Sequence, residues 1–132
     1  MSPRDVARVL AAGRIAIGAG LVAAPRLTIG LWVGREAASA RVAPVGRALG
    51  IREVVLGAMA LHTLGSPPVA RRWLRTLALC DVVDLAATIA ARRELPAPSV
   101  ALIALLASAA AGGQLWAAGA LADQPAAQPA RS

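Results

Sequence analysis

The chain has 132 residues, enough for one domain, and 58% of them are hydrophobic although only 2% are aromatic. A water-soluble core of this size usually contains several large rings, so the excess of Ala, Leu, Val, Ile and Gly favours close helix packing in a membrane. The net charge is +7 and every basic residue is arginine, but without long basic runs or an aromatic stacking platform, nucleic-acid binding is not expected.

Several residue types are missing or nearly so. Lys, Asn, Phe and Tyr are absent, and because their codons are A/T-rich, a GC-rich bacterial genome explains the enrichment in Arg and Ala. The single cysteine, Cys80, excludes an internal disulfide and a Cys-based metal cluster. The single histidine, His62, has no His or Cys partner for a metal. We therefore expect no metal and no cofactor, and we assign no catalytic residue.

The nine prolines divide the chain into four apolar stretches. Proline breaks helices because it lacks an amide donor and clashes with the preceding turn. Each stretch has about 20 residues, the length of helix that crosses a bilayer core: 4–24, 45–65, 72–92 and 98–122. We predict an all-α fold, a four-helix transmembrane bundle of up-down-up-down topology. It forms one domain over 1–122, and a Pro/Ala/Gln-rich, disordered tail follows at 123–132.

The first stretch, 4–24, admits a second interpretation. Two arginines precede the apolar sequence IAIGAGLVAA, as in a cleaved signal peptide. Three more hydrophobic stretches follow, and Arg14 interrupts the apolar run, so we favour a membrane span. Small residues at Ala12, Ala16, Gly20 and Ala24 predict a close helix contact on this span.

Residues 26–43 mix apolar and charged side chains. This segment fits a short helix at the membrane surface, anchored by Arg26, Arg35 and Trp32, and it fits a loop that dips into the interface equally well. The chain has no internal repeat that would support an inverted-repeat transporter.

The second stretch carries charges among small residues. In GRALGIREVVLG, helical spacing places Gly46, Gly50, Glu53 and Gly57 on one face. We predict that another helix approaches this face closely and that the three glycines serve helix packing.

The third stretch holds two acids, Asp81 and Asp84, which share a helical face. If the second and third stretches fold into an antiparallel hairpin around the prolines at 67–68, Arg52 lies at the depth of Asp84. Asp81 is then about one turn away.

The fourth stretch is free of charge from Leu95 to Ala122, which is typical of a membrane span. Ala104, Ser108 and Gly112 predict a second small-residue contact on this span.

Five ionisable residues thus converge on the middle of the predicted bilayer core. They form the candidate functional site: Arg14, Arg52, Glu53, Asp81 and Asp84. A charge facing lipid at a helix centre costs about 2.5–3.5 kcal/mol. We therefore expect a buried charge network in which opposite charges pair inside the bundle.

Three functional interpretations remain open for this network. The first is a structural ion-pair network that fixes helix packing in a non-enzymatic protein, such as an accessory subunit. The second is a transporter or channel for a proton or a small polar or anionic solute. The third is a membrane enzyme acting on a lipid or quinone. The paired acids Asp81 and Asp84 could also serve as acid and base or hold a hard cation, but no His or further acid completes a metal-binding shell.

The predicted location is the bacterial plasma membrane. Four spans place both termini on one side, and because the arginines divide evenly between the two sides, the positive-inside rule gives no orientation. The short N-terminal tail favours the cytoplasm. The expected partners are membrane lipids and either further copies of the chain or a larger membrane complex.

The charged motifs also resemble those of known proteins. They consist of R-x-x-G-x-R-[DE] followed by D-x-x-D, at Arg47, Gly50, Arg52, Glu53, Asp81 and Asp84. The pattern is similar to that of small four-helix bacterial integral membrane proteins of unknown function, over about residues 5–122. The resemblance implies a four-helix membrane bundle and transfers no activity.

Overall fold

The structure is a computed structural model that describes residues 1–36 and 38–122. The fold is all-helical, with 84% of residues in helices and no strand within the described ranges. In chain order these ranges hold α1 (Pro3–Ala23), α2 (Pro25–Val33), a short 3-10 helix η1 (Ala40–Val42), α3 (Ala43–Thr63), α4 (Pro67–Ala90) and α5 (Ala97–Ala120). The predicted disordered tail, 123–132, lies outside the described residues.

Prolines begin the helices. Each of the five α-helices has proline at its first or second position, where the missing amide proton has no partner within the helix. For this reason α4 begins at Pro67, ahead of the predicted stretch 72–92. At the start of α1, the Asp5 amide donates to Ser2 Oγ and the Ser2 amide donates to Asp5 Oδ2, each at 3.2 Å, which forms a capping box.

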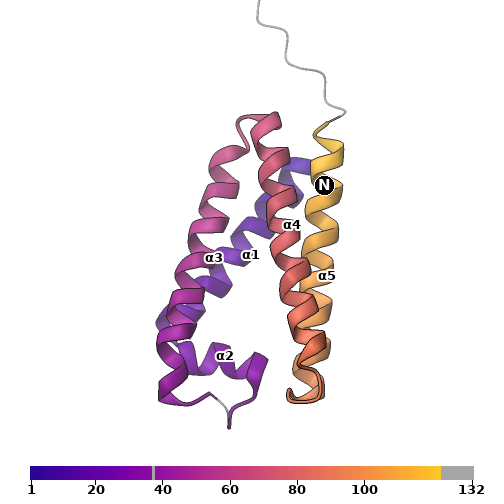
Figure 1. Cartoon of the computed structure of the whole chain (residues 1–132). Coiled ribbons are helices and arrows are strands. Elements are labelled where there is room, and N and C mark those ends of the chain that lie inside the picture. The colour runs from indigo at the N-terminus through magenta and orange to yellow at the C-terminus, as the bar shows by residue number, and fades with distance from the viewer. Residues whose placement is uncertain (37, 123–132) are drawn as a thin grey trace, which may run out of the picture.

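The four long helices run in alternating directions, and the short α2 lies at one end of the bundle (Figure 1). Of the two alternatives for 26–43, the structure thus has a helix at Pro25–Val33. α1 packs most extensively on α3, and α4 on α5, whereas the α1–α5 and α3–α4 contacts are smaller. The bundle is therefore two tight helix pairs, α1/α3 and α4/α5, with α1 and α4 diagonally opposite.

Glycines bring the backbones of α1 and α3 into contact. A Cβ atom added to Gly50 would lie 2.6 Å from the carbonyl oxygen of Gly18, and one added to Gly57 would lie 2.8 Å from that of Ala11. Gly46 instead meets the start of α2, where an added Cβ would lie 3.1 Å from Pro25 Cβ. Because a side chain at Gly50 or Gly57 would collide with backbone, the two helices approach this closely only with glycine there.

Of the other two predicted small-residue contacts, only Gly20 makes a close one: it is half-buried, and a Cβ added there would lie 3.2 Å from Thr28 Oγ1 of α2. Ala12 and Ala16 of α1, and Ser108 and Gly112 of α5, are exposed. The buried faces are formed instead by neighbouring small residues, Ala7, Ala11 and Gly18 in α1 and Ala107, Ala111 and Ala118 in α5. Small residues are so frequent in both helices that their spacing does not select a face.

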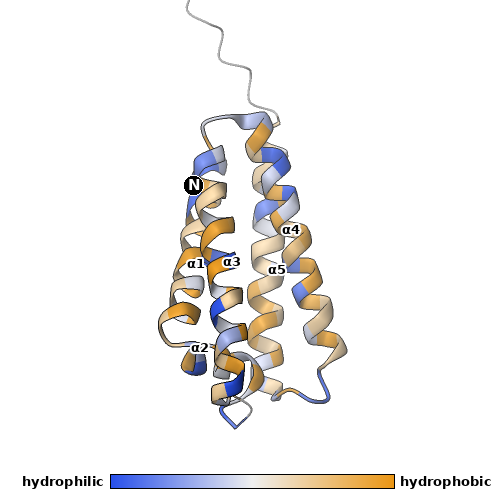
Figure 2. Ribbon diagram, turned by 60° about the vertical axis from the view of Figure 1, so that its left-hand side comes forward, coloured by the Kyte–Doolittle hydropathy of each residue, from blue (hydrophilic) through white to orange (hydrophobic). Residues whose placement is uncertain are grey.

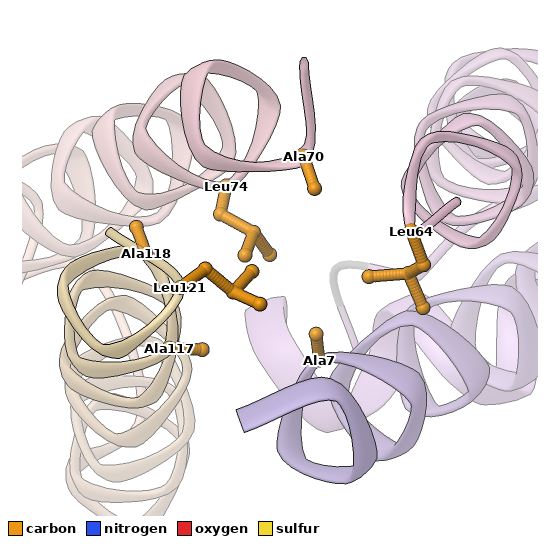
Figure 3. Close-up of a cluster of buried hydrophobic side chains, with 7 residues drawn as sticks. All are labelled: Ala7, Leu64, Ala70, Leu74, Ala117, Ala118 and Leu121. Atoms are coloured by element: carbon orange, nitrogen blue, oxygen red, sulfur yellow. The ribbon is translucent and has the colours of Figure 1, made fainter. Parts of the chain in front are cut away.

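The apolar core is built largely from alanine and leucine. One cluster lies where α4 starts and α5 ends, and its side chains turn toward one another in Figure 3: Ala7, Leu64, Ala70, Leu74, Ala117, Ala118 and Leu121. A second cluster joins α1, α3 and α4 through Ala11, Ala60 and Leu77. Leu21 and Ile29 belong to a third, which holds α2 against α1. The first two clusters therefore hold the two helix pairs together through small apolar contacts.

Two helices, α1 and α5, are long and apolar enough to cross a membrane. α3 and α4 have 21 and 24 residues, but hydrophilic bands interrupt both in Figure 2. Large apolar side chains still face outward on all four long helices, since Val9, Val55, Leu79 and Leu105 are each more than half exposed. α3 and α4 thus combine outward apolar side chains with buried acidic residues, Glu53 on α3 and Asp81 on α4.

Candidate functional site

Arg14 lies on the face of α1 that the bundle buries. The buried residues of this helix recur at intervals of three and four, which places them on one side: Ala7, Ala11, Arg14, Gly18 and Leu21. Arg14 is only 8% exposed. Its guanidinium group therefore needs acceptors inside the bundle.

The guanidinium group of Arg14 bridges two other helices. Nη1 donates to Oε2 of Glu53 on α3, and Nη2 donates to Oδ1 of Asp81 on α4, each at 2.5 Å. Both carboxylates are buried. Hydrogen bonds between ionised partners are stronger than neutral ones and fix direction as well as distance, so Arg14 positions α3 and α4 relative to α1.

Gln114 adds the fourth long helix. Its Nε2 donates to Oδ2 of Asp81 at 2.9 Å, and the residue is 2% exposed. We call these four residues the polar centre: Glu53, Arg14, Asp81 and Gln114, from α3, α1, α4 and α5. Sequence reasoning that followed charges missed Gln114. The available signal was a lone amide in a charge-free apolar helix, which generally finds an internal partner.

Two of the five predicted site residues stand apart from the polar centre. The side chain of Arg52 is 45% exposed, and its Nε lies 3.9 Å from Oε1 of Glu53, a long contact for an ion pair. Asp84 is half-buried, and the described residues provide it with no ion pair within 4.0 Å. The expected pairing of Arg52 with Asp84 is therefore not formed.

Helix geometry explains why Arg52 faces outward. Successive residues of an α-helix point about 100° apart, so when Glu53 lies at the middle of the buried face, Arg52 points well to one side of it. α3 turns inward the face that carries Glu53 with Gly46, Gly50 and Gly57, all of which are buried. Close packing of these glycines on α1 and α2 thus selects Glu53 and leaves Arg52 at the surface.

The polar centre has more acceptors than donors. Oε1 of Glu53 and Oε1 of Gln114 are buried without a hydrogen-bond donor in the described part of the chain. Arg14 contributes +1 and the carboxylates of Glu53 and Asp81 contribute −1 each, which leaves −1; the neighbouring Asp84 and Arg52 cancel, so the total stays at −1. A buried acceptor without a donor costs about 1–3 kcal/mol. The site is therefore suited to accept further hydrogen bonds or positive charge.

A cleft of about 460 Å³ leads to the polar centre. Its walls are formed mainly by apolar side chains of α1, α2 and α5, among them Val9, Leu10, Ile17, Leu31, Trp32, Leu102 and Leu106. All four residues of the polar centre line it too, as does Asp84. The volume falls within the range of roughly 300–1,000 Å³ of small-molecule sites. An apolar space between α1 and α5 thus adjoins the buried carboxylates.

The single cysteine and the single histidine lie outside this cleft. Cys80 is a free, half-buried thiol, and His62 is exposed near the end of α3. Within residues 1–36 and 38–122, His, Cys, Asp and Glu form no group of three that could hold a metal ion.

The chain matches no protein-family model, no curated protein and no solved structure. The resemblance to small four-helix bacterial membrane proteins therefore stays a prediction.

Proposed function

We propose that the chain is an integral protein of the bacterial plasma membrane, with α1, α3, α4 and α5 each crossing the bilayer and both termini in the cytoplasm. The four helices have 21–24 residues, which suits a hydrocarbon core about 30 Å thick. Their apolar side chains face outward while Arg14, Glu53 and Asp81 are buried. Leu27 and Leu31 of α2 are 78% and 61% exposed, which suits a helix lying in the membrane surface.

The function that the geometry supports best is structural. The observation that carries it is the guanidinium group of Arg14, which donates to Glu53 and Asp81 at 2.5 Å each. In a bilayer, each of these charges would cost about 2.5–3.5 kcal/mol if it faced lipid. Only the helix register that pairs them avoids this cost. The polar centre thus defines one arrangement of the four helices. The outward faces of these helices contact lipid and either further copies of the chain or a larger membrane complex, in which the protein is an accessory subunit.

Replacing Arg14 tests this proposal. In Arg14→Gln the Glu53 and Asp81 carboxylates lose their counter-ion, so we expect several-fold less protein in carbonate-washed bacterial membranes and a lower melting temperature in detergent micelles. Arg8→Gln is the matched control, because the Arg8–Asp5 ion pair is exposed on the same helix and such pairs contribute little. Equal amounts and melting temperatures for the two variants would reject a structural role for the polar centre. Release of the wild-type protein by the carbonate wash would reject the membrane location.

A transporter or channel is the second candidate, favoured by the cleft that adjoins the same charges. If Glu53 lies on the pathway of a proton or small solute, the purified protein in liposomes should conduct it, and Glu53→Gln should abolish conduction. Glu94→Gln, at an exposed acid outside the long helices, should conduct like the wild type. Liposomes that stay impermeable to protons and to a broad solute panel would remove this candidate.

A further inference from the structure

We propose that the cleft between α1 and α5 binds an apolar amine in its ammonium form, with the ammonium group against Asp84 and the apolar body along the cleft walls. The inference goes beyond the structural role of the polar centre, because it concerns the acid that this centre leaves without a counter-ion.

The walls of the cleft determine the body of the ligand. They are formed by aliphatic side chains of α1 and α5, such as Val9, Ile17 and Leu106, with Leu31 and Trp32 from α2. The volume of about 460 Å³ holds a compact hydrocarbon group, and burial of apolar surface favours its entry. A hydrated inorganic ion would gain nothing from these walls.

The charge at the inner wall determines the head group. Asp84 lines the cleft one helical turn from Asp81, on the side nearer α2, and among the described residues it forms no ion pair within 4.0 Å, so Arg52 and Arg14 act on it only over a longer distance. Together with the polar centre and the half-exposed Arg52, it leaves a formal charge of −1. An anion is repelled there, and a neutral apolar molecule leaves this charge uncompensated.

The unpaired acceptors favour an ammonium group with N–H donors. Glu53 is 8% exposed and Gln114 is 2% exposed; both line the cleft, and each has one buried oxygen without a donor. An ammonium group carries up to three donors and no acceptor, which complements a site with surplus acceptors. Trp32 lines the same cleft, and an indole ring attracts organic cations through its face.

The test compares three adamantane probes of one shape with different charge: 1-adamantylamine, neutral 1-methyladamantane and 1-adamantanecarboxylate. Each is titrated calorimetrically into the full-length protein in detergent micelles, with empty micelles as the blank. We expect one amine per chain, bound at least about tenfold more tightly than the methyl compound. The carboxylate should not displace it.

Variants locate the site. Asp84→Asn should weaken amine binding about tenfold, and Glu94→Gln, which removes an exposed acid outside the cleft, should leave it unchanged. Gly13→Leu provides a second, uncharged test, because Gly13 lines the cleft and a Cβ there would meet nothing within 4 Å. It should narrow the cleft and weaken binding without disturbing the fold.

Three results would overturn the proposal. Equal affinity for the amine and its methyl analogue would make the cleft a groove for neutral lipid chains. Unchanged amine binding in both Asp84→Asn and Gly13→Leu would place the amine elsewhere. If the heat of amine binding does not exceed that of the empty micelles, the cleft does not bind apolar amines.

Discussion

The guanidinium group of Arg14 is shared by Glu53 and Asp81, while Asp84, one turn further along α4, forms no ion pair within 4.0 Å among the described residues. Two chemically identical acids on one helix face therefore differ in environment. Removing Asp81 takes away half of the ion pairing of a buried arginine, which is strongly destabilising in proteins. Removing the charge of Asp84 relieves the cost of its partial burial, which outweighs its longer-range attraction to Arg52.

We therefore expect the two aspartates to respond differently to the same substitution. Asp81→Asn should lower the free energy of unfolding by about 3 kcal/mol, whereas Asp84→Asn should change it by less than about 0.5 kcal/mol or raise it. Unfolding of each variant in detergent micelles, followed by circular dichroism, measures both values. Equal losses at the two positions would contradict the pairing of Arg14 with Asp81.

At the scale of elements, the contact between α1 and α3 depends on glycine. An added Cβ at Gly50 would lie 2.6 Å from the Gly18 carbonyl oxygen and 2.8 Å from Leu21 Cβ. Backbone atoms cannot move aside as the end of a flexible side chain can, so the helices must separate. Glu53 lies one turn along the same face, and its contact with Arg14 would lengthen with that separation.

Alanine at two glycines should therefore have opposite effects. Gly50→Ala should lower the free energy of unfolding by about 1–3 kcal/mol through overpacking, although alanine is the better helix former. In Gly112→Ala, in α5, the added Cβ has no atom within 4 Å, so this substitution should raise the free energy of unfolding by up to about 1 kcal/mol. The same denaturation assay measures both. A stabilising Gly50→Ala would show that α1 and α3 do not touch at this glycine.

Sequence reasoning succeeded where the information is local. Proline positions identify helix beginnings, because a missing amide proton is harmless only in the first turn. Helical periodicity identifies the glycine face of α3 with Glu53 on it, because the period is a property of one helix. The inward positions of Arg14 and Asp81 followed from the cost of leaving charges in an apolar environment.

Sequence reasoning failed where a side chain's environment depends on which helices pack against each other. Placing Arg52 beside Asp84 by counting equal numbers of residues outward from the prolines at 67–68 assumes that α3 and α4 pack closely along their length. In the structure, α3 packs chiefly on α1. Gln114 is neutral, and no pattern of charges in the sequence indicates that its amide donates to Asp81. The cleft depends on the positions of α1, α2 and α5 together, which no local pattern in the chain specifies.

At the scale of the whole molecule, the polar centre links the two helix pairs. The contact of Arg14 with Glu53 lies within α1/α3, and that of Asp81 with Gln114 lies within α4/α5. The contact of Arg14 with Asp81 joins the pairs across the diagonal. It acts together with the apolar clusters that also join the pairs. Because it is directional, it specifies the register of one pair against the other.

A double-mutant cycle on Arg14 and Asp81 tests this claim most directly. Arg14→Gln, Asp81→Asn and the double variant are unfolded in detergent micelles, and the Arg8–Asp5 surface pair serves as the control cycle. The account predicts a coupling energy of about 2–3 kcal/mol between Arg14 and Asp81, with the double variant more stable than the sum of the single losses implies, and no measurable coupling in the control. Additive losses at Arg14 and Asp81 would contradict it.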